Sequence, residues 1–142
     1  MSVKKGEIVG VGGLSSCGMH ALGKAMFGAL ALESGNVLTG EGEVITTPHM
    51  AIEKKIGYVS KDRDVESLCL SASIKDNIAI AGMEQFAVGG HLITNANEKK
   101  YVRKQIQDLS IKCSDENQLT GQLSGGNKQK VVFGKWIGCG SE

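Results

Sequence analysis

The chain has 142 residues, enough for one domain, and its 16 basic and 15 acidic residues leave a formal charge of +1. This balance gives no electrostatic basis for binding nucleic acid or an anionic membrane surface. No apolar run approaches the roughly 20 residues that a membrane-spanning helix needs, and the cysteines form no C-x-x-C pair, so neither a zinc site nor a disulfide framework is indicated. Its many glycines and its 41% of hydrophobic residues are typical of a turn-rich α/β domain.

The first element predicted is a buried strand, followed by a glycine-rich turn and a helix. Residues 8–11 are apolar and rich in β-branched side chains, as expected for a strand with both faces buried in a parallel sheet. The turn has glycines at positions 13 and 18, the G-x-x-x-x-G spacing of loops that bind phosphate through backbone N–H groups. Apolar residues at 22, 25, 26, 29 and 30 then predict a helix that packs on the sheet.

The end of this turn departs from a working phosphate-binding loop. A lysine followed by serine or threonine is expected there, whereas this chain has Met19 and His20. The positive charge for the phosphates and the hydroxyl for Mg²⁺ are therefore both missing, while the backbone cradle remains as a candidate site. Its residues are Gly13, Leu14, Ser15, Ser16, Cys17, Gly18, Met19 and His20.

A β-hairpin, a connector helix and a second buried strand are predicted next. Val37-Leu38 and Val44-Ile45 flank a Gly-Glu-Gly turn, and Pro48 favours the first turn of a short helix. Residues 56–59 are expected to form the strand, and residues 60–64 a charged loop.

Two helices are predicted in the segment that follows. Ser73 and Asp76 have capping-box spacing and are expected to start a helix that continues through residue 80. Residues 81–97 are aperiodic and predict a surface loop, at the end of which Asn97 caps a helix over residues 98–109. The apolar face of that helix consists of Tyr101, Val102, Ile106 and Leu109.

A polar connector over residues 111–122 leads to a last helix, which Ser124 is expected to cap. The buried side of this helix is expected to carry Val132, Phe133, Trp136 and Ile137. Its start has a specific motif, made of Leu123, Ser124, Gly125, Gly126, Asn127, Lys128 and Gln129 and followed by Lys130. This octet resembles the LSGGQ-type signature of ABC transporter ATPases, in the L-S-G-G-N-x-Q-K form of the sugar-importer branch.

The resemblance covers essentially the whole chain. The chain is similar to the second nucleotide-binding domain of the tandem ATPase subunit in ribose, galactose and xylose importers, whose first strand reads G-E-I-x-G-V-x-G-L, as residues 6–14 nearly do. Lys61 stands where the family's Q-loop has a Gln or Glu that contacts metal and water, and a cation there cannot ligate Mg²⁺. The family's Walker B strand and switch histidine would follow residue 142, so the chain resembles a middle piece of the domain.

The fold that this resemblance implies is α/β, a truncated P-loop NTPase of the ABC ATPase type. It would have a parallel core sheet, a β-hairpin and a helical signature subdomain. The implied division is a P-loop core with the Q-loop over residues 1–63, a helical subdomain over 64–125 and the signature helix over 126–142.

The function that it implies is that of the ATP-binding part of a sugar-import ABC transporter, peripheral on the cytoplasmic face of the membrane. The loop would be a degenerate Walker A motif, and the signature would complete the ATP site of a partner domain. The chain alone is expected to be inactive, because the Walker B strand and the switch histidine would lie outside it and His20 stands at the Mg²⁺-binding hydroxyl position. No residue of the chain is assigned a catalytic or metal-binding role. ATP would bind weakly or through the partner, and Mg²⁺ only in the complete transporter. The expected partners are another nucleotide-binding domain and permease subunits, and exposed sheet edges would favour self-association.

Of three other classes of protein, the sequence disfavours two and is compatible with the third. A dinucleotide-binding module is disfavoured because Gly10 and Gly12 are followed by Ser15 in place of a third glycine. A small kinase is disfavoured because it would use the missing loop lysine on the β- and γ-phosphates. A non-hydrolysing structural or regulatory P-loop domain is compatible with the altered loop.

Overall fold

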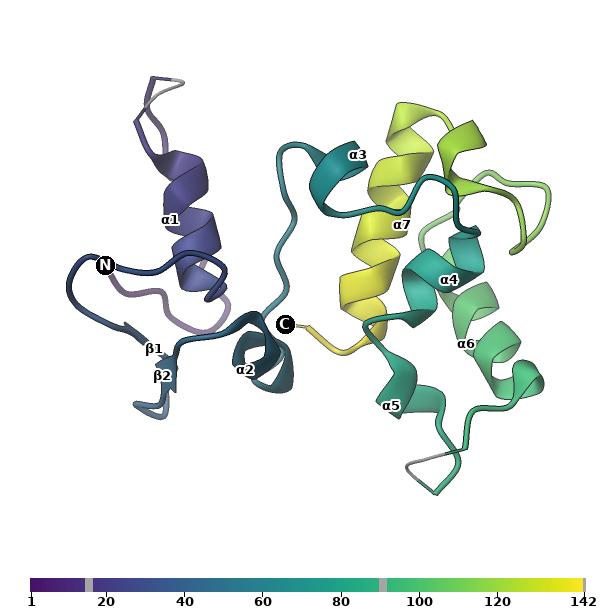
Figure 1. Ribbon diagram of the computed structural model, residues 1–142, viewed down its shortest axis with the longest axis horizontal. Coiled ribbons are helices and arrows are strands. Elements are labelled where there is room, and N and C mark those ends of the chain that lie inside the picture. Colours follow the sequence, from purple (N-terminus) through teal and green to yellow (C-terminus); the bar gives the residue numbers. More distant parts are fainter. Residues whose placement is uncertain (15–16, 90–91, 142) are drawn as a thin grey trace.

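The computed structural model describes residues 1–14, 17–89 and 92–141 as a mixed arrangement of helices and a short hairpin. In Figure 1 the first helix and the hairpin lie on one side, and the later helices gather on the other. The elements in chain order are α1 (Met19–Met26), β1 (Val37–Leu38), β2 (Val44–Ile45), α2 (Pro48–Glu53), α3 (Arg63–Glu66), α4 (Ile74–Ala79), α5 (Met83–Phe86), α6 (Asn95–Asp108), η1 (Thr120–Gln122) and α7 (Gly125–Gly138).

The predicted parallel core sheet is not confirmed. Within the described ranges, the sheet consists of β1 and β2 alone, which pair antiparallel with Val37 opposite Ile45. Residues 8–11 and 56–59 are not strands, and Ile8 is 99% exposed. A strand is held by the backbone hydrogen bonds of a neighbouring strand, and neither segment has such a neighbour here. Extended chain therefore stands where two buried strands were expected.

The hairpin and the connector helix form as predicted. The Thr47 hydroxyl accepts a hydrogen bond from the Met50 amide at 3.3 Å, and Pro48 occupies the first turn of α2, where its missing N–H costs nothing. Helix α1 is shorter than expected, because Gly28 at φ 73° ends it and its amide donates to the Ala25 carbonyl at 3.0 Å. Without a sheet beneath it, most of the apolar stripe of α1 is exposed.

The predicted N-cap is correct for α4 and lies three residues too late for α6. The Ser73 hydroxyl accepts from the Asp76 amide at 3.0 Å and the Asp76 carboxylate accepts from the Ser73 amide at 3.2 Å, so the predicted capping box is confirmed. Helix α6 begins earlier than predicted, because the Thr94 hydroxyl accepts from the Asn97 amide at 3.2 Å. Thr94 is thus the cap, and Asn97 lies within the first turn.

Three segments that were expected to be loops contain short helices. Helix α5 lies inside the predicted loop over residues 81–97, α3 begins within the predicted charged loop over 60–64, and η1 ends the connector over 111–122. None of these three elements is longer than four residues, too short for an amphipathic period to be recognisable in the sequence.

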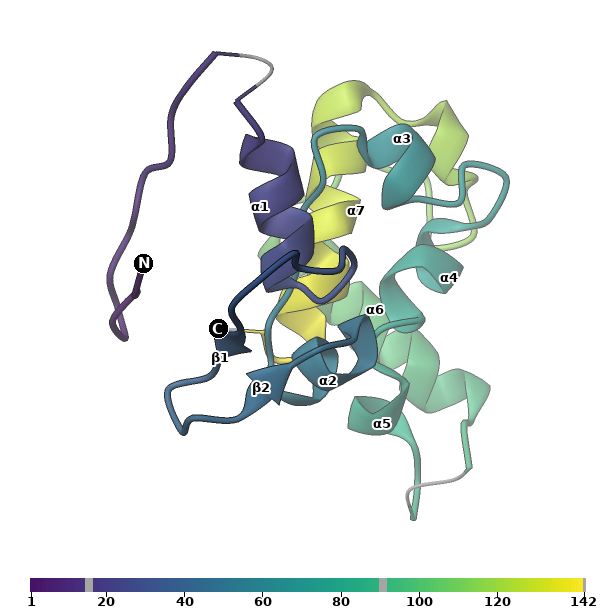
Figure 2. The same cartoon turned by 60° about the vertical axis from the view of Figure 1, so that its left-hand side comes forward.

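Two hydrophobic clusters hold the chain together, and Trp136 packs against both. The first cluster lies between α4, α6 and α7 and consists of Leu68, Ile74, Ile78, Ala79, Phe86, Val102, Ile111, Leu123, Val131 and Val132. The second cluster consists of Phe27, Ile45 and Ala51. The Trp136 ring meets the Phe27 ring edge-on, with centroids 5.5 Å apart. Figure 2 shows α7 beside α6, and the Trp136 ring joins their cluster to the second one.

The buried faces of α6 and α7 differ in part from the predicted ones. On α7 the fully buried residues are Val131 and Val132, whereas Phe133 and Ile137 are 40% and 53% exposed. On α6, Val102 is buried as predicted, and Gln105 is buried beside it. The apolar period of the sequence predicted both helices correctly, but it identified only part of the face that each helix buries.

Replacing Trp136 with alanine should reduce the free energy of unfolding by about 3 kcal/mol or more, because the change opens a cavity between both clusters. The matched control is Phe133→Ala on the same helix, which removes an exposed ring and should cost about 1 kcal/mol or less. Urea denaturation of the two variants measures the difference. Equal costs would contradict the role given to Trp136.

Candidate functional site

The described part of the phosphate-type loop forms a tight turn that leads into α1. The Cys17 amide donates to the Leu14 carbonyl at 2.9 Å, and a Cβ atom at Gly13 would lie 2.5 Å from Cys17 Sγ. Gly18 has φ 81°, a left-handed conformation that glycine adopts without strain, and its carbonyl accepts the first helical bond, from Leu22. The glycines at 13 and 18 are thus needed where the spacing placed them. The predicted Ser15 and Ser16 lie outside the described residues.

The start of α1 offers backbone donors without a cationic side chain at the two diagnostic positions. Met19 is half-buried and His20 is exposed, and these two residues begin the eight-residue helix. The first N–H groups of a helix have no partner inside it and suit an anion. Methionine supplies no charge and imidazole no hydroxyl, so these residues fit phosphate through the backbone and do not fit Mg²⁺.

A lysine in the last turn of α1 pairs with a glutamate of α3. Lys24 Nζ lies 2.6 Å from Glu66 Oε1, on the surface. The hydrogen bond from Lys24 lowers the pKa of the Glu66 carboxyl, and the same bond raises the pKa of Lys24. Lys61, the predicted Q-loop residue, is exposed and lies two positions before α3 begins. The loop helix and the Lys61 segment are therefore joined through α3.

The signature residues form the start of α7 as predicted, with Ser124 at the N-cap. The Ser124 hydroxyl does not bind a backbone amide, as a cap usually does; it accepts from Asn127 Nδ2 at 3.0 Å. Asn127 in turn accepts from the Lys112 amide at 3.0 Å. Gly125 and Gly126 are exposed, and a Cβ atom at Gly126 would meet nothing within 4 Å. The first amides of a 14-residue helix thus remain open to solvent.

The remaining signature residues turn toward the protein. Leu123 is buried in the helical cluster. Lys128 Nζ lies 2.9 Å from Asp64 Oδ2, and Arg63 Nη1 donates to Gln129 Oε1 at 3.4 Å. Asp64 was missed by the sequence analysis, because nothing in a local pattern indicates a partner 64 positions away.

The phosphate-type loop and the signature turn lie at the same end of the molecule in both views (Figures 1 and 2). The structure does not bring them together into one pocket within the described ranges. Nor does the part of the chain that the structure describes hold a group of three His, Cys, Asp or Glu side chains suited to a metal ion. No helix among the described residues is long and apolar enough to cross a membrane.

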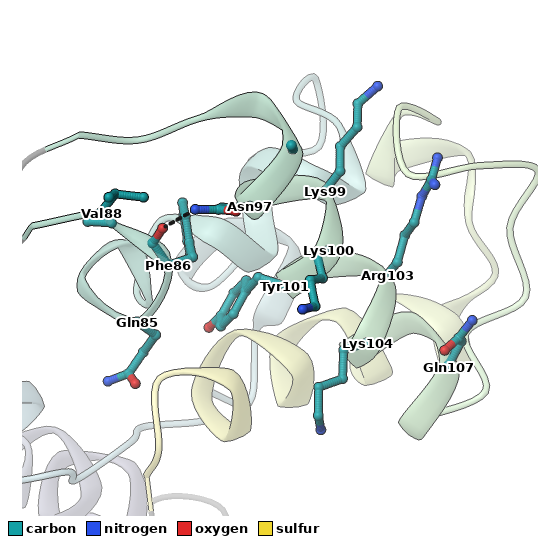
Figure 3. A pocket seen from close by; sticks show the side chains of 12 residues that line it. Gln85, Phe86, Val88, Asn97, Lys99, Lys100, Tyr101, Arg103, Lys104 and Gln107 are labelled. Carbon is teal, nitrogen blue, oxygen red and sulfur yellow. Dashed lines mark hydrogen bonds between the residues drawn. The ribbon is translucent and has the colours of Figure 1, made fainter.

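An open groove of about 940 Å³ lies between α5 and α6, away from both predicted sites. In Figure 3 the side chains of Lys99 and Arg103 point away from that of Lys104, and all three come from α6. Arg103 and Lys99 lie 2.9 and 3.9 Å from Glu116, and Lys104 is paired with Asp108. Glu116 and Asp108 therefore compete with any external anion for these three cations, and the groove is not assigned as an anion site.

Comparison with known proteins identifies relatives over nearly the whole chain. A family model described as ABC transporter matches residues 1–141. The ribose import ATP-binding protein RbsA of Lactococcus lactis subsp. lactis is 41% identical over 96% of this chain, and that of Bacillus subtilis is 39% identical over 97%. The chain spans 28% of the length of each of these relatives. No solved structure was found to match it.

Replacing Gly18 with alanine should strain the loop by roughly 1–2 kcal/mol, because an L-residue disfavours the left-handed conformation. The helical bond from Leu22 to the Gly18 carbonyl should then open more often, and the Leu22 amide should exchange with solvent about tenfold faster. Gly12→Ala is the matched control, since a Cβ atom there meets nothing within 4 Å and its φ is not positive. Equal exchange rates in both variants would contradict the loop geometry.

Proposed function

Because this chain belongs to the ABC transporter family, we propose that it is part of the ATP-binding subunit of a sugar importer. Relatives named ribose import ATP-binding protein support a pentose as the cargo of the whole transporter. In that assembly the subunit lies on the cytoplasmic face of the membrane and works with permease subunits and a second nucleotide-binding domain. We propose that the chain is divided into a P-loop core over residues 1–63, a helical subdomain over 64–125 and the signature helix over 126–142.

The chain's own loop has a reduced role in this proposal. The turn that ends at Gly18 supports binding of phosphate by backbone amides, and Met19 and His20 supply neither a lysine nor a Mg²⁺-ligating hydroxyl. Lys61 at the Q-loop position is likewise unsuited to Mg²⁺. ATP therefore binds weakly at this loop, and Mg²⁺ is held only in the complete transporter. ATP supplies the phosphoryl group there, and this chain contributes backbone N–H donors that hold the phosphates in position.

The signature turn has the principal role. The observation that carries the proposal is the exposed pair Gly125 and Gly126 at the start of α7, where unpartnered amides and the positive end of the helix dipole meet solvent. A γ-phosphate held by another domain can approach this turn closely, because no side chain covers Gly126. The chain therefore completes the ATP site of its partner domain.

Replacing Met19 with lysine and His20 with serine should tighten ATP binding by roughly 1.5–3 kcal/mol, the scale of a charge-assisted hydrogen bond. Titration calorimetry on this chain measures the change. The control is Met26→Lys, which adds the same charge at the far end of α1 and should leave binding unchanged. An unchanged affinity in the double variant would mean that the loop is not shaped to hold phosphate.

In the full-length subunit, Gly125→Asp and Gly126→Asp should abolish transport, whereas Met19→Ala should leave most of it. An aspartate at either glycine places a negative charge against the partner's γ-phosphate. At Gly126 a Cβ atom meets nothing within 4 Å, and an acidic side chain in the first turn of α7 favours the helix, so loss of folding does not explain the effect there. At Gly125 the new side chain also meets Arg63, so Gly126→Asp is the decisive variant. Sugar uptake into vesicles or cells measures it. Loss of uptake in Met19→Ala with normal uptake in Gly126→Asp would reverse the two roles.

A further inference from the structure

The four-residue helix α3 makes polar contacts with one face of the signature helix. Asp64 accepts from Lys128 at 2.9 Å, and Arg63 donates to Gln129 at 3.4 Å. A Cβ atom at Gly125 would lie 3.0 Å from Arg63 Nη2. Positions 125, 128 and 129 are spaced i, i+3 and i+4, so they share one face of α7, and α3 covers this face.

The lysine of the pair between Asp64 and Lys128 is far less exposed than either side chain of the pair between Lys104 and Asp108 on α6. The Lys128 side chain is 13% exposed, whereas Lys104 and Asp108 on α6 are 69% and 51% exposed. Exposed pairs contribute little, because water screens both charges. A mostly buried lysine that loses its carboxylate is left poorly solvated, so breaking the first pair has a larger effect than breaking the second.

Helix α3 also contacts the helix that follows the phosphate-type loop. Glu66 accepts from Lys24 of α1 at 2.6 Å. α3 begins two positions after Lys61, and in both views it lies beside the N-terminal end of α7 (Figures 1 and 2). One short helix thus contacts α1, the Lys61 segment and the signature turn.

We propose that α3 is a clamp that sets the position of the signature turn, with Asp64 and Lys128 as its positioning residues. This inference rests on the proposed role of that turn in completing a partner's ATP site. Lys128 and Gln129, although part of the signature motif, hold the turn in place, and the free amides at the start of α7 receive the phosphate.

Residue-resolved amide exchange in this chain tests the clamp. The Lys128 amide donates to the Ser124 carbonyl at 2.9 Å and reports on the first turn of α7. Asp64→Asn and Lys128→Gln should each speed exchange at residues 128–130 by about tenfold. The charge-swapped pair Asp64→Lys with Lys128→Asp, and the conservative Lys128→Arg, should stay within about threefold of the native rate. Asp108→Asn, which breaks the exposed pair on α6, is the control and should leave these residues unchanged.

Kinetics of ATP hydrolysis in the full-length transporter distinguish a positioning role from a purely structural contact. Asp64→Asn and Lys128→Gln should lower kcat for ATP hydrolysis about tenfold with KM unchanged, and the charge-swapped pair should recover most of it. The clamp is overturned if residues 128–130 exchange at the native rate in the single variants. It is also overturned if the charge-swapped pair lowers kcat as much as the single variants do. Normal transport in Gly126→Asp overturns the proposed function alone, because the exchange experiment does not depend on a partner site.

Discussion

The packing of Trp136 between two small hydrophobic clusters is the interaction on which the rest of the structure depends. Its ring contacts Phe27 edge-on at 5.5 Å and also packs against the helical cluster. Edge-on pairs of aromatic rings are favourable because a positive ring edge meets a negative ring face. Lys135, beside it, lies 5.3 Å from the ring centroid and donates to the Ser67 carbonyl at 2.7 Å, and burial lowers the pKa of this lysine. The second half of α7 is thereby fixed to both halves of the chain.

This constraint explains a glycine that no motif identified. A Cβ atom at Gly57 would lie 3.0 Å from the Trp136 ring, so a side chain at position 57 would push the segment before Lys61 away from the tryptophan. The same segment leads directly into α3, which contacts the first turns of α7. α7 is therefore held by apolar packing near its end and by polar contacts near its start.

Features that depend on neighbouring residues were predicted from the sequence. Features that depend on contacts with residues far away in the chain were not. The capping box at Ser73, the hairpin and the proline start of α2 each arise within a few residues, and each was confirmed. Thr94 and Asn97 are both suitable caps, and choosing between them requires knowing where the chain turns. The strands predicted at 8–11 and 56–59 needed partner strands, which the described residues do not supply. The contact of Asp64 with α7 has no local signal at all.

The signature motif shows why a motif predicts a site better than it predicts the role of each residue. Successive residues of a helix point about 100° apart, so adjacent letters of a motif meet different surroundings. Gly126 faces open space, Asn127 binds the Lys112 amide, and Lys128 binds Asp64. In the proposed function, a partner's phosphate therefore meets the start of the helix, where amides are exposed, because the polar residues that follow already bind within the chain. In the proposed function those internal contacts position the helix start, so the motif would combine binding and positioning residues in one short stretch.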